Sequence, residues 1–276
     1  MKIPAPTSLL GFVHIPKTAG SSMKFILRNS FGLRHCNLRA VAPNEEATDE
    51  DVEFARRVHW FGLRCISGHD LVGSCFALST PADYFTFVRD PKSRCLSHFL
   101  HAKRAHRRKG KNLSVFQFLE NRSRWNLQLA VIAGDQNLDR GKEALEQFLF
   151  VGLSEHFADS VVALKNLSAQ PLDARYVRLH VTPNVEDKRE VLADPVAMEL
   201  LEEANQLDEE LYAYVRDQLY PRFMKKAGVE PGSVDPVSLE RESLTLRYWL
   251  NRWYQKGLYR PLVKRRRRRL LELAGQ

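Results

Sequence analysis

Short apolar runs alternate along this chain with longer amphipathic stretches, and the alternation predicts where strands and helices lie. Four runs have the length and composition of buried parallel strands. They are Leu9–Ile15, Leu63–Ser67, Tyr84–Val88 and Phe148–Leu153. Two shorter segments with a strand-like pattern are Arg34–Val41 and Arg175–Leu179.

Helical segments fill the intervals between these strands. The predicted helices begin at Met23 and then cover Glu50–His59, Lys92–His106, Leu113–Glu120, Arg124–Ala133, Glu155–Leu167, Pro195–Asn205 and Asp208–Lys226. This spacing predicts an α/β protein with a three-layer, P-loop-like fold, in which helices flank a central, mainly parallel sheet with right-handed crossovers. Ligands of such sheets bind beyond the carboxyl ends of the strands.

A segment rich in Pro, Gly and Ser, Gly228–Ser238, interrupts the pattern. We therefore expect a main domain over residues 1–227, a linker over 228–238 and a basic helical extension over 239–276. In the extension, four large apolar side chains recur at helical spacing and predict one apolar face: Leu246, Trp249, Leu250 and Trp253.

Charge distinguishes the extension from the rest of the chain. The formal net charge is +9, and residues 241–276 hold eleven Lys or Arg against two Asp or Glu, so residues 1–240 are neutral overall. A neutral body disfavours nucleic acid as the main partner, although a nucleic-acid-binding module that uses this tail stays as an alternative. The run Lys264–Arg269 fits equally a helix on an anionic membrane surface or the solvated end of a helix packed on the domain.

Composition sets the broad class of protein. A chain of 276 residues with 44% hydrophobic and 27% charged residues is typical of a soluble globular protein. No apolar run approaches the ~20 residues of a membrane span, and the N-terminal stretch runs directly into a polar turn at Lys17, which disfavours a cleaved signal peptide. The four cysteines show no paired spacing, which predicts reduced thiols and no zinc site: Cys36, Cys65, Cys75 and Cys95.

The turn after the first strand has the features of an anion site. Pro16 ends the strand, and Lys17–Ser22 places a cation, a flexible glycine and three hydroxyls before a helix. Free N–H groups and the helix dipole both favour an anion there. The lysine precedes Gly20, whereas the Walker pattern places it after the glycine, so an ordinary ATP or GTP loop is a poor match.

A second strand-to-helix junction repeats this chemistry. Arg89 ends the strand and presents a planar fork suited to phosphate, Asp90 and Pro91 are an N-cap and first helical residue, and Ser97 adds a hydroxyl two turns later. The alternative is an ordinary arginine–aspartate ion pair at a strand end.

A histidine follows the third strand, in Ser67-Gly68-His69-Asp70. Histidine titrates near neutrality and suits a general base, although a core or capping histidine is the alternative. Asp70 is placed either to orient His69 or to cap the next segment. His14 lies inside the first predicted strand, so we expect it to be structural.

Three segments together resemble a sulfotransferase family that includes the heparan and uronosyl O-sulfotransferases and many bacterial homologues. The string HIPKTAGSS resembles the family's 5′-phosphosulfate loop, and FVRDPKSRCLSHF resembles its 3′-phosphate motif. Gly68-His69 resembles the glycine–histidine pair that carries the proposed general base of the uronosyl enzymes. The resemblance extends from Leu9 to Leu219.

This resemblance implies a donor, a site and a reaction. The donor is 3′-phosphoadenosine 5′-phosphosulfate (PAPS), which leaves adenosine 3′,5′-bisphosphate as product, and the transfer needs no metal. By this resemblance, Arg89 and Ser97 bind the 3′-phosphate. The 5′-phosphate is bound by the first loop: Lys17, Thr18, Ala19, Gly20, Ser21 and Ser22. His69 acts as general base, and Lys17 offsets charge on the leaving group. The acceptor is a hydroxyl of a carbohydrate or glycoconjugate. An enzyme held at a membrane surface would act on such an acceptor attached to a lipid.

Some positions depart from the family pattern. Ser21 replaces the commoner threonine and keeps the hydroxyl, and Phe99 replaces a frequent tyrosine. Ala130 stands where an arginine often follows the Asn-x-Gln segment, so no acceptor contact is carried over to this position. The chain lacks the N-terminal anchor of the Golgi enzymes, so we expect a cytoplasmic protein, with the tail as a peripheral contact to the inner membrane face. The basic stretch Lys103–Lys111 is either an acceptor contact or a solvated helix end. The alternative function is a nucleotide-dependent kinase with an atypical phosphate loop.

Overall fold

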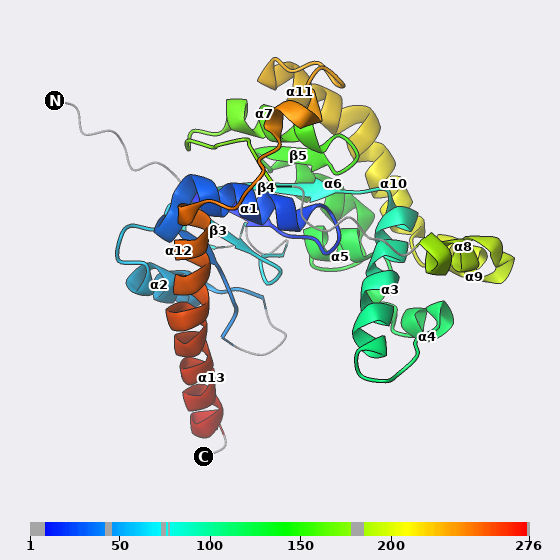
Figure 1. The fold of residues 1–276 in the computed structure, drawn as a ribbon, viewed down its shortest axis with the longest axis horizontal. Helices are drawn as coiled ribbons and strands as arrows, with labels where there is room; N and C mark the ends of the chain where they lie inside the picture. Colours follow the sequence, from blue (N-terminus) through cyan, green and yellow to red (C-terminus); the bar gives the residue numbers. More distant parts are fainter. Residues whose placement is uncertain (1–8, 42–45, 73–75, 77, 178–184, 275–276) are drawn as a thin grey trace.

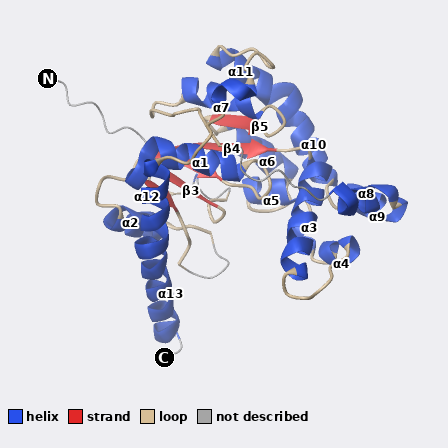
Figure 2. Ribbon diagram, viewed as in Figure 1, coloured by secondary structure: helices blue, strands red, loops and turns tan. Residues whose placement is uncertain are grey.

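The computed structural model describes residues 9–41, 46–72, 76, 78–177 and 185–274. Five parallel strands form one sheet in the order β2-β3-β1-β4-β5. The strands are β1 (Leu9–Val13), β2 (His35–Asn37), β3 (Cys65–Gly68), β4 (Ala82–Val88) and β5 (Phe150–Leu153). Figure 2 shows this small sheet within a mostly helical molecule. The predicted α/β architecture with a central parallel sheet is confirmed.

After β1 the chain first moves outward to the edge of the sheet and then returns toward its centre. Helix α1 (Gly20–Phe31) carries the chain from β1 to β2, and α2 (Asp49–Val58) returns it to β3. Because right-handed crossovers of opposite direction lie on opposite faces, α1 and α2 cover different faces of the sheet. Figure 1 shows α1 crossing in front of the strands. The order then reverses between β1 and β4, and that reversal opens a crevice at their carboxyl ends.

A long helical insertion connects β4 to β5. It comprises α3 (Pro91–Arg107), α4 (Val115–Leu119), α5 (Leu127–Ala133) and α6 (Leu138–Glu146), with a short 3₁₀ turn, Arg122–Arg124, before α5. As predicted, the Asp90 side chain accepts a hydrogen bond from the Ser93 N–H, and Pro91 is the first residue of α3.

The helices after β5 complete the main body. They are α7 (Phe157–Leu167), α8 (Val185–Ala193), α9 (Pro195–Glu203), α10 (Gln206–Tyr214) and α11 (Tyr220–Ala227). A π-helical turn, Val215–Leu219, joins α10 to α11, so the helix predicted over Asp208–Lys226 is continuous but carries this bulge. Helices α3, α4, α8 and α9 share a second, smaller apolar cluster beside the main core, built around Phe99, Phe118 and Leu201.

The weaker strand predictions were only partly right. The strand predicted over Arg34–Val41 shrinks to the three residues of β2, which follow a 3₁₀ turn, Gly32–Arg34. In the segment predicted as a strand over Arg175–Leu179, Tyr176 forms a single bridge with Glu240, and residues 178–179 lie outside the described part of the chain. Alternation over so few residues does not specify a sheet partner.

The segment after α11 is held to the main body by a buried carboxylate. Asp159 of α7 accepts hydrogen bonds from the N–H groups of Gly232 (2.9 Å) and Val234 (3.0 Å). A 3₁₀ turn, Pro236–Leu239, follows. Residues 228–238, predicted as a linker, therefore run over the surface of the domain with fixed hydrogen bonds.

One long helix ends the described chain. It consists of α12 (Leu246–Tyr254), a π-helical turn (Gln255–Tyr259) and α13 (Arg260–Ala274), and it confirms the predicted C-terminal helical extension. Figure 1 shows α12 against α1, with α13 continuing past the body of the molecule. Tyr248, Tyr259 and Val263 belong to the same hydrophobic core as the sheet.

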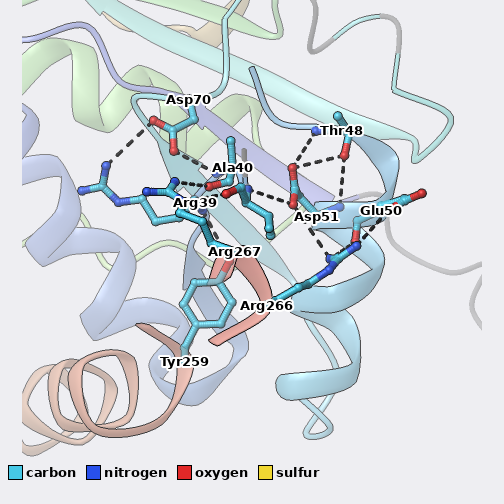
Figure 3. A network of polar contacts seen from close by, with 10 residues as sticks. Arg39, Ala40, Thr48, Glu50, Asp51, Asp70, Tyr259, Arg266 and Arg267 are labelled. Carbon is cyan, nitrogen blue, oxygen red and sulfur yellow. Dashed lines mark hydrogen bonds and ion pairs between the residues drawn. The ribbon is translucent and has the colours of Figure 1, made fainter. Parts of the chain in front are cut away.

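Side-chain amides of this helix satisfy the backbone of the edge strand β2. Asn251 donates hydrogen bonds to the carbonyls of Gly32 (2.7 Å) and His35 (2.8 Å). Gln255 donates to the same His35 carbonyl and accepts from the N–H of Asn37, both at 3.3 Å. Further along, Figure 3 shows Arg266 on Glu50 and Arg267 on the carbonyls of Ala40 and Val41.

Candidate functional site

A pocket of about 420 Å³ opens at the carboxyl ends of β1, β3 and β4, where the strand order reverses. Its lining contains all but one of the residues predicted from the sequence. The lining residues are His14, Pro16, Lys17, Ala19, Gly20, Ser21, Ser22, His69, Arg89, Ser97, His98 and His101. Two larger or equal hollows at the opposite end of α1 contain none of these residues.

The first loop presents the bare N-terminus of α1 to the pocket. No side chain caps this helix and its first turn contains no acidic residue, so its leading N–H groups stay available to an anion. Lys17 (φ 73°) and Ala19 (φ 57°) both adopt the left-handed conformation, which costs a non-glycine residue about 1–2 kcal/mol. Such strain is typical of ligand-binding loops.

Gly20 serves this loop by its lack of volume. The left-handed residues of the loop are Lys17 and Ala19, and Gly20 is not among them. A Cβ at position 20 would lie 1.7 Å from Nε2 of His14, which is buried directly beneath the loop. The glycine therefore lets the helix terminus approach the His14 ring closely.

His14 and His69 form a close, tilted ring pair in the lining of the pocket. Their ring centroids are 3.9 Å apart, and the Nδ1 atom of His69 lies 2.8 Å from the carbonyl oxygen of His14. Because a carbonyl only accepts, this hydrogen bond assigns the His69 proton to Nδ1 and leaves a lone pair on Nε2. His14 was predicted to be structural, and it lies beyond the end of β1 and lines the pocket.

Burial and nearby cations keep both histidines neutral. Burial, followed by the charge of Lys24, lowers the pKa of His69 to about 4, and the same two causes lower the pKa of His14 well below its usual value. Lys24 itself is largely buried, and burial lowers its pKa to about 7. An anion in the pocket would offset these cations and raise the pKa of His69 toward neutrality.

Asp70 is not the partner of His69. Its carboxylate accepts a hydrogen bond from the Ala40 N–H at 2.9 Å and forms an ion pair with Arg39 at 3.8 Å. Figure 3 shows both interactions. These contacts give Asp70 a role that was not among the two considered: it binds the segment after β2, while the His14 carbonyl orients His69.

Arg89 connects the two anion loops. Its guanidinium Nη1 donates to the carbonyl of Lys17 at 3.2 Å, across the top of neighbouring strands β1 and β4. Its backbone is clasped by Gln128, which donates to the Arg89 carbonyl (2.8 Å) and accepts from the Arg89 N–H (2.9 Å). Asp208 in turn accepts from the N–H groups of Gln128 and Leu129, so a buried chain of hydrogen bonds fixes the arginine's backbone.

A second side chain, Glu155, fixes the backbone of Asp90, the residue after Arg89. The Glu155 carboxylate accepts from the N–H of Asp90 (3.0 Å) and from the hydroxyl of Tyr212 (3.3 Å). These contacts of Gln128, Glu155 and Tyr212 with the Arg89 and Asp90 backbones were not predicted, because a side-chain contact with a distant backbone has no local sequence signature.

The hydroxyls predicted for the site do not all face it. Thr18 is fully buried, and its hydroxyl donates to the carbonyl of Ile15 at 2.9 Å, so its side chain shapes the loop and does not line the pocket. Ser21, Ser22 and Ser97 do line the pocket. Only the backbone of Thr18 therefore remains suited to the predicted contact.

Helix α3 adds two histidines and a nearby arginine to one side of the pocket, and none of the three was predicted as a site residue. His98 and His101 line the pocket beside Ser97, and the charge of Arg104 on the same helix helps to lower the pKa of Lys17, after burial and Arg89. Burial lowers the pKa of His98 to about 4. Ser97, His101 and Arg104 follow a helical i, i+4, i+7 spacing, which was a readable signal for one polar face.

Two negative findings concern the described residues. Among them, no three His, Cys, Asp or Glu side chains gather in a way that could hold a metal ion. Within the same part of the chain, every helix is too short or too polar to cross a bilayer.

The fold and site define an α/β protein with a pocket between two strand–loop–helix junctions whose lining is suited to anions. Residues 3–215 match the model of the sulfotransferase family. The chain belongs to this family and is therefore a transferase of sulfuryl groups. No curated protein matches the chain significantly. The closer likeness to the heparan and uronosyl enzymes stays a prediction.

Proposed function

We propose that this protein transfers the sulfuryl group of PAPS to a hydroxyl of a carbohydrate or glycoconjugate, with His69 as general base. The observation that carries the proposal is the hydrogen bond from Arg89 to the Lys17 carbonyl, which joins two anion loops around one pocket that also contains His69. One phosphate needs one such loop. Two loops fit a nucleotide with phosphates on both its 3′ and 5′ oxygens.

The lining accommodates such a donor. The uncapped terminus of α1 with Ser21 and Ser22 suits the 5′-phosphate, and Arg89 with Ser97 suits the 3′-phosphate. The lack of a side chain at Gly20 lets the N-terminus of α1, with its free N–H groups, lie directly against His14. When bound, the donor supplies an activated sulfur whose bond to the phosphate oxygen breaks.

The chain's own residues manage the proton and the charge. Nε2 of His69 takes the proton from the attacking acceptor hydroxyl as the new sulfur–oxygen bond forms. The electron pair of the broken bond stays on the phosphate oxygen, where the Lys17 ammonium and the N-terminus of α1 offset the charge. The His14 carbonyl holds the His69 proton on Nδ1, so Nε2 needs no tautomer change.

The acceptor lies against the α3 side of the pocket in this proposal. His98 and His101 offer polar edges suited to sugar hydroxyls. The stretch Lys103–Lys111 contributes less than its charge suggests, since Lys103 and Arg107 both pair with the buried Asp187 at 2.9 and 2.8 Å. Free buried thiols at Cys36, Cys65 and Cys95 support our further proposal of a cytoplasmic location.

Calorimetry without metal tests the donor. We expect adenosine 3′,5′-bisphosphate to bind in the presence of EDTA far more tightly than AMP or ATP. Loss of a charge-assisted contact costs about 1.5–3 kcal/mol, so Arg89→Ala should weaken the bisphosphate about tenfold or more and leave AMP nearly unchanged. Arg175→Ala, an exposed arginine outside the pocket, is the matched control. Equal affinities for AMP and bisphosphate would refute the second phosphate site, and tighter binding of ATP with Mg²⁺ would favour a kinase.

A further inference from the structure

An exposed aromatic surface lies on the far side of α12 from the domain. Four side chains of one helical stripe are exposed there, among them Trp253 at 73% and Leu246 at 75%: Leu246, Trp249, Leu250 and Trp253. Phe61 lines the same hollow as Leu250, and Trp60, also 73% exposed, stacks on Phe61 at 3.9 Å. We call these six residues the Trp patch. Three of the four tryptophans of the chain belong to it.

The helix does not use this stripe to bind its own domain. It docks through the opposite side, where Tyr248, Asn251, Tyr254 and Gln255 are buried. Arg28 donates to the Tyr248 hydroxyl, and the Tyr254 hydroxyl donates to the Val58 carbonyl. Docking to the domain and exposure of an apolar face, which the sequence presented as alternatives, therefore coexist on one helix.

Cations surround the Trp patch. Arg34 and Arg247 line the hollow that contains Phe61 and Leu250, and the guanidinium of Arg252 lies 5.8 Å from the centre of the Trp249 ring. Lys256 is exposed one turn beyond. The surface thus combines indole rings with positive charge, the composition of interfacial membrane-binding segments.

Beyond the π turn, the exposed side of the C-terminal helix leads into the basic run Lys264–Arg269 of α13. A π turn inserts one residue, so the buried side resumes at Tyr259 and Val263 and the exposed side at Leu258 and then Arg265. Arg266 and Arg267 are directed to the domain, where they bind α2 and the segment after β2 (Figure 3). Other arginines of the run, Arg265, Arg268 and Arg269, are exposed.

We propose that the Trp patch and the exposed arginines of α13 dock the protein on an anionic lipid bilayer. The indoles enter the headgroup region while the cations meet acidic lipid, each basic residue near the surface contributing several-fold to the partition coefficient. A second copy is a worse occupant, because a symmetric contact would bring the arginines of one patch against those of the other.

Helix α1 connects this surface to the donor pocket and sets its orientation. Gly20 at its first residue lines the pocket, whereas Phe31 at its last residue lines the hollow of the Trp patch. The eleven residue steps of helix between them correspond to about 16 Å. Docking therefore leaves the donor pocket open to water.

Vesicle co-sedimentation of the full chain tests the proposal. We expect the protein to pellet with phosphatidylglycerol–phosphatidylcholine vesicles at low salt, and to stay in solution with phosphatidylcholine alone. The double variant W249S/W253S should lower the partition coefficient about tenfold or more. F116S/V196S, which removes two exposed apolar side chains elsewhere, is the matched control and should bind like the wild type. R265E/R268E/R269E should lower binding by a similar factor and reduce its salt dependence.

A measurement without substitution accompanies the variants. Brominated acyl chains should quench the wild-type tryptophan fluorescence in anionic vesicles, because Trp60, Trp249 and Trp253 all enter the bilayer. Unquenched fluorescence, equal binding to neutral vesicles, or full binding by W249S/W253S would overturn the proposal. A dimer seen by light scattering that W249S/W253S abolishes would overturn it in favour of a second copy. Binding of adenosine 3′,5′-bisphosphate should be unchanged in every variant, which separates this proposal from the proposed reaction.

Discussion

Gly20→Ala is the smallest change that tests how the first anion loop is built. The added Cβ would meet Nε2, Cδ2 and Cε1 of His14 at 1.7, 2.2 and 2.6 Å. His14 is held between Phe12, 5.3 Å away between ring centroids, and His69 at 3.9 Å, so its ring has little room to move. Overpacking of a buried site costs about 1–3 kcal/mol. One kcal/mol shifts Tm by about 2–4 °C in a domain of this size.

We therefore expect Gly20→Ala to lower Tm by about 2–12 °C in differential scanning fluorimetry and to weaken adenosine 3′,5′-bisphosphate measurably in calorimetry. Ala19→Gly is the matched control, because it relieves a left-handed alanine and should keep or raise Tm. The double variant H14A/G20A removes the clashing ring and should recover bisphosphate affinity relative to Gly20→Ala alone. Wild-type Tm and affinity in Gly20→Ala would refute the claim that this glycine is required for space.

Three further predictions concern the base, pH and the C-terminal connection. His69→Ala should keep bisphosphate affinity and lower turnover about 10²–10⁴-fold, measured as transfer of labelled sulfate into an extract; unchanged turnover would move the base elsewhere. The pKa of His69 and of His98 falls from 6.5 to about 4 on folding, so the unfolded chain binds more protons between these values. Stability is then full above pH 6.5 and lost as the pH falls toward 4, by about 3 kcal/mol for each histidine; a Tm independent of pH over this range would contradict the burial of both rings. Asp159→Asn should lower Tm by about 3–10 °C and speed proteolysis within residues 228–238, because two N–H groups lose a carboxylate acceptor; an unchanged cleavage rate would show that this clamp is dispensable.

The sheet could be predicted because each main strand is a continuous apolar run. Leu9–Val13 and Tyr84–Val88 are buried on both faces of the sheet, and burial of that kind leaves a direct trace in composition. β2 has only three residues, and its position depends on distant partners, so its length was overpredicted. The π turns were missed although the sequence carries a signal for them. A proline follows each turn two residues later, Pro221 after Val215–Leu219 and Pro261 after Gln255–Tyr259, and proline lacks the N–H that a regular helix uses.

The candidate site was predictable where function lies in local loops. Arg89 and His69 each follow a strand directly and Lys17 lies four residues beyond β1, and parallel strands bring their carboxyl ends together. The groups that position them come from elsewhere in the chain. Gln128 reaches Arg89 from 39 residues away, and the His14 carbonyl reaches His69 from 55 residues away. Local patterns carry no information about such pairings.

The contact between Gln255 and β2 has a consequence for how the protein behaves in a crowded solution. β2 is the edge strand of the sheet, so the His35 carbonyl and the Asn37 N–H have no strand partner on its outer side. The Gln255 amide donates to the first and accepts from the second, as a residue of a neighbouring parallel strand would. An open edge of this kind recruits strands from other molecules. The C-terminal helix therefore ends the sheet by occupying this edge with the carboxamides of Asn251 and Gln255, where one more strand would otherwise pair.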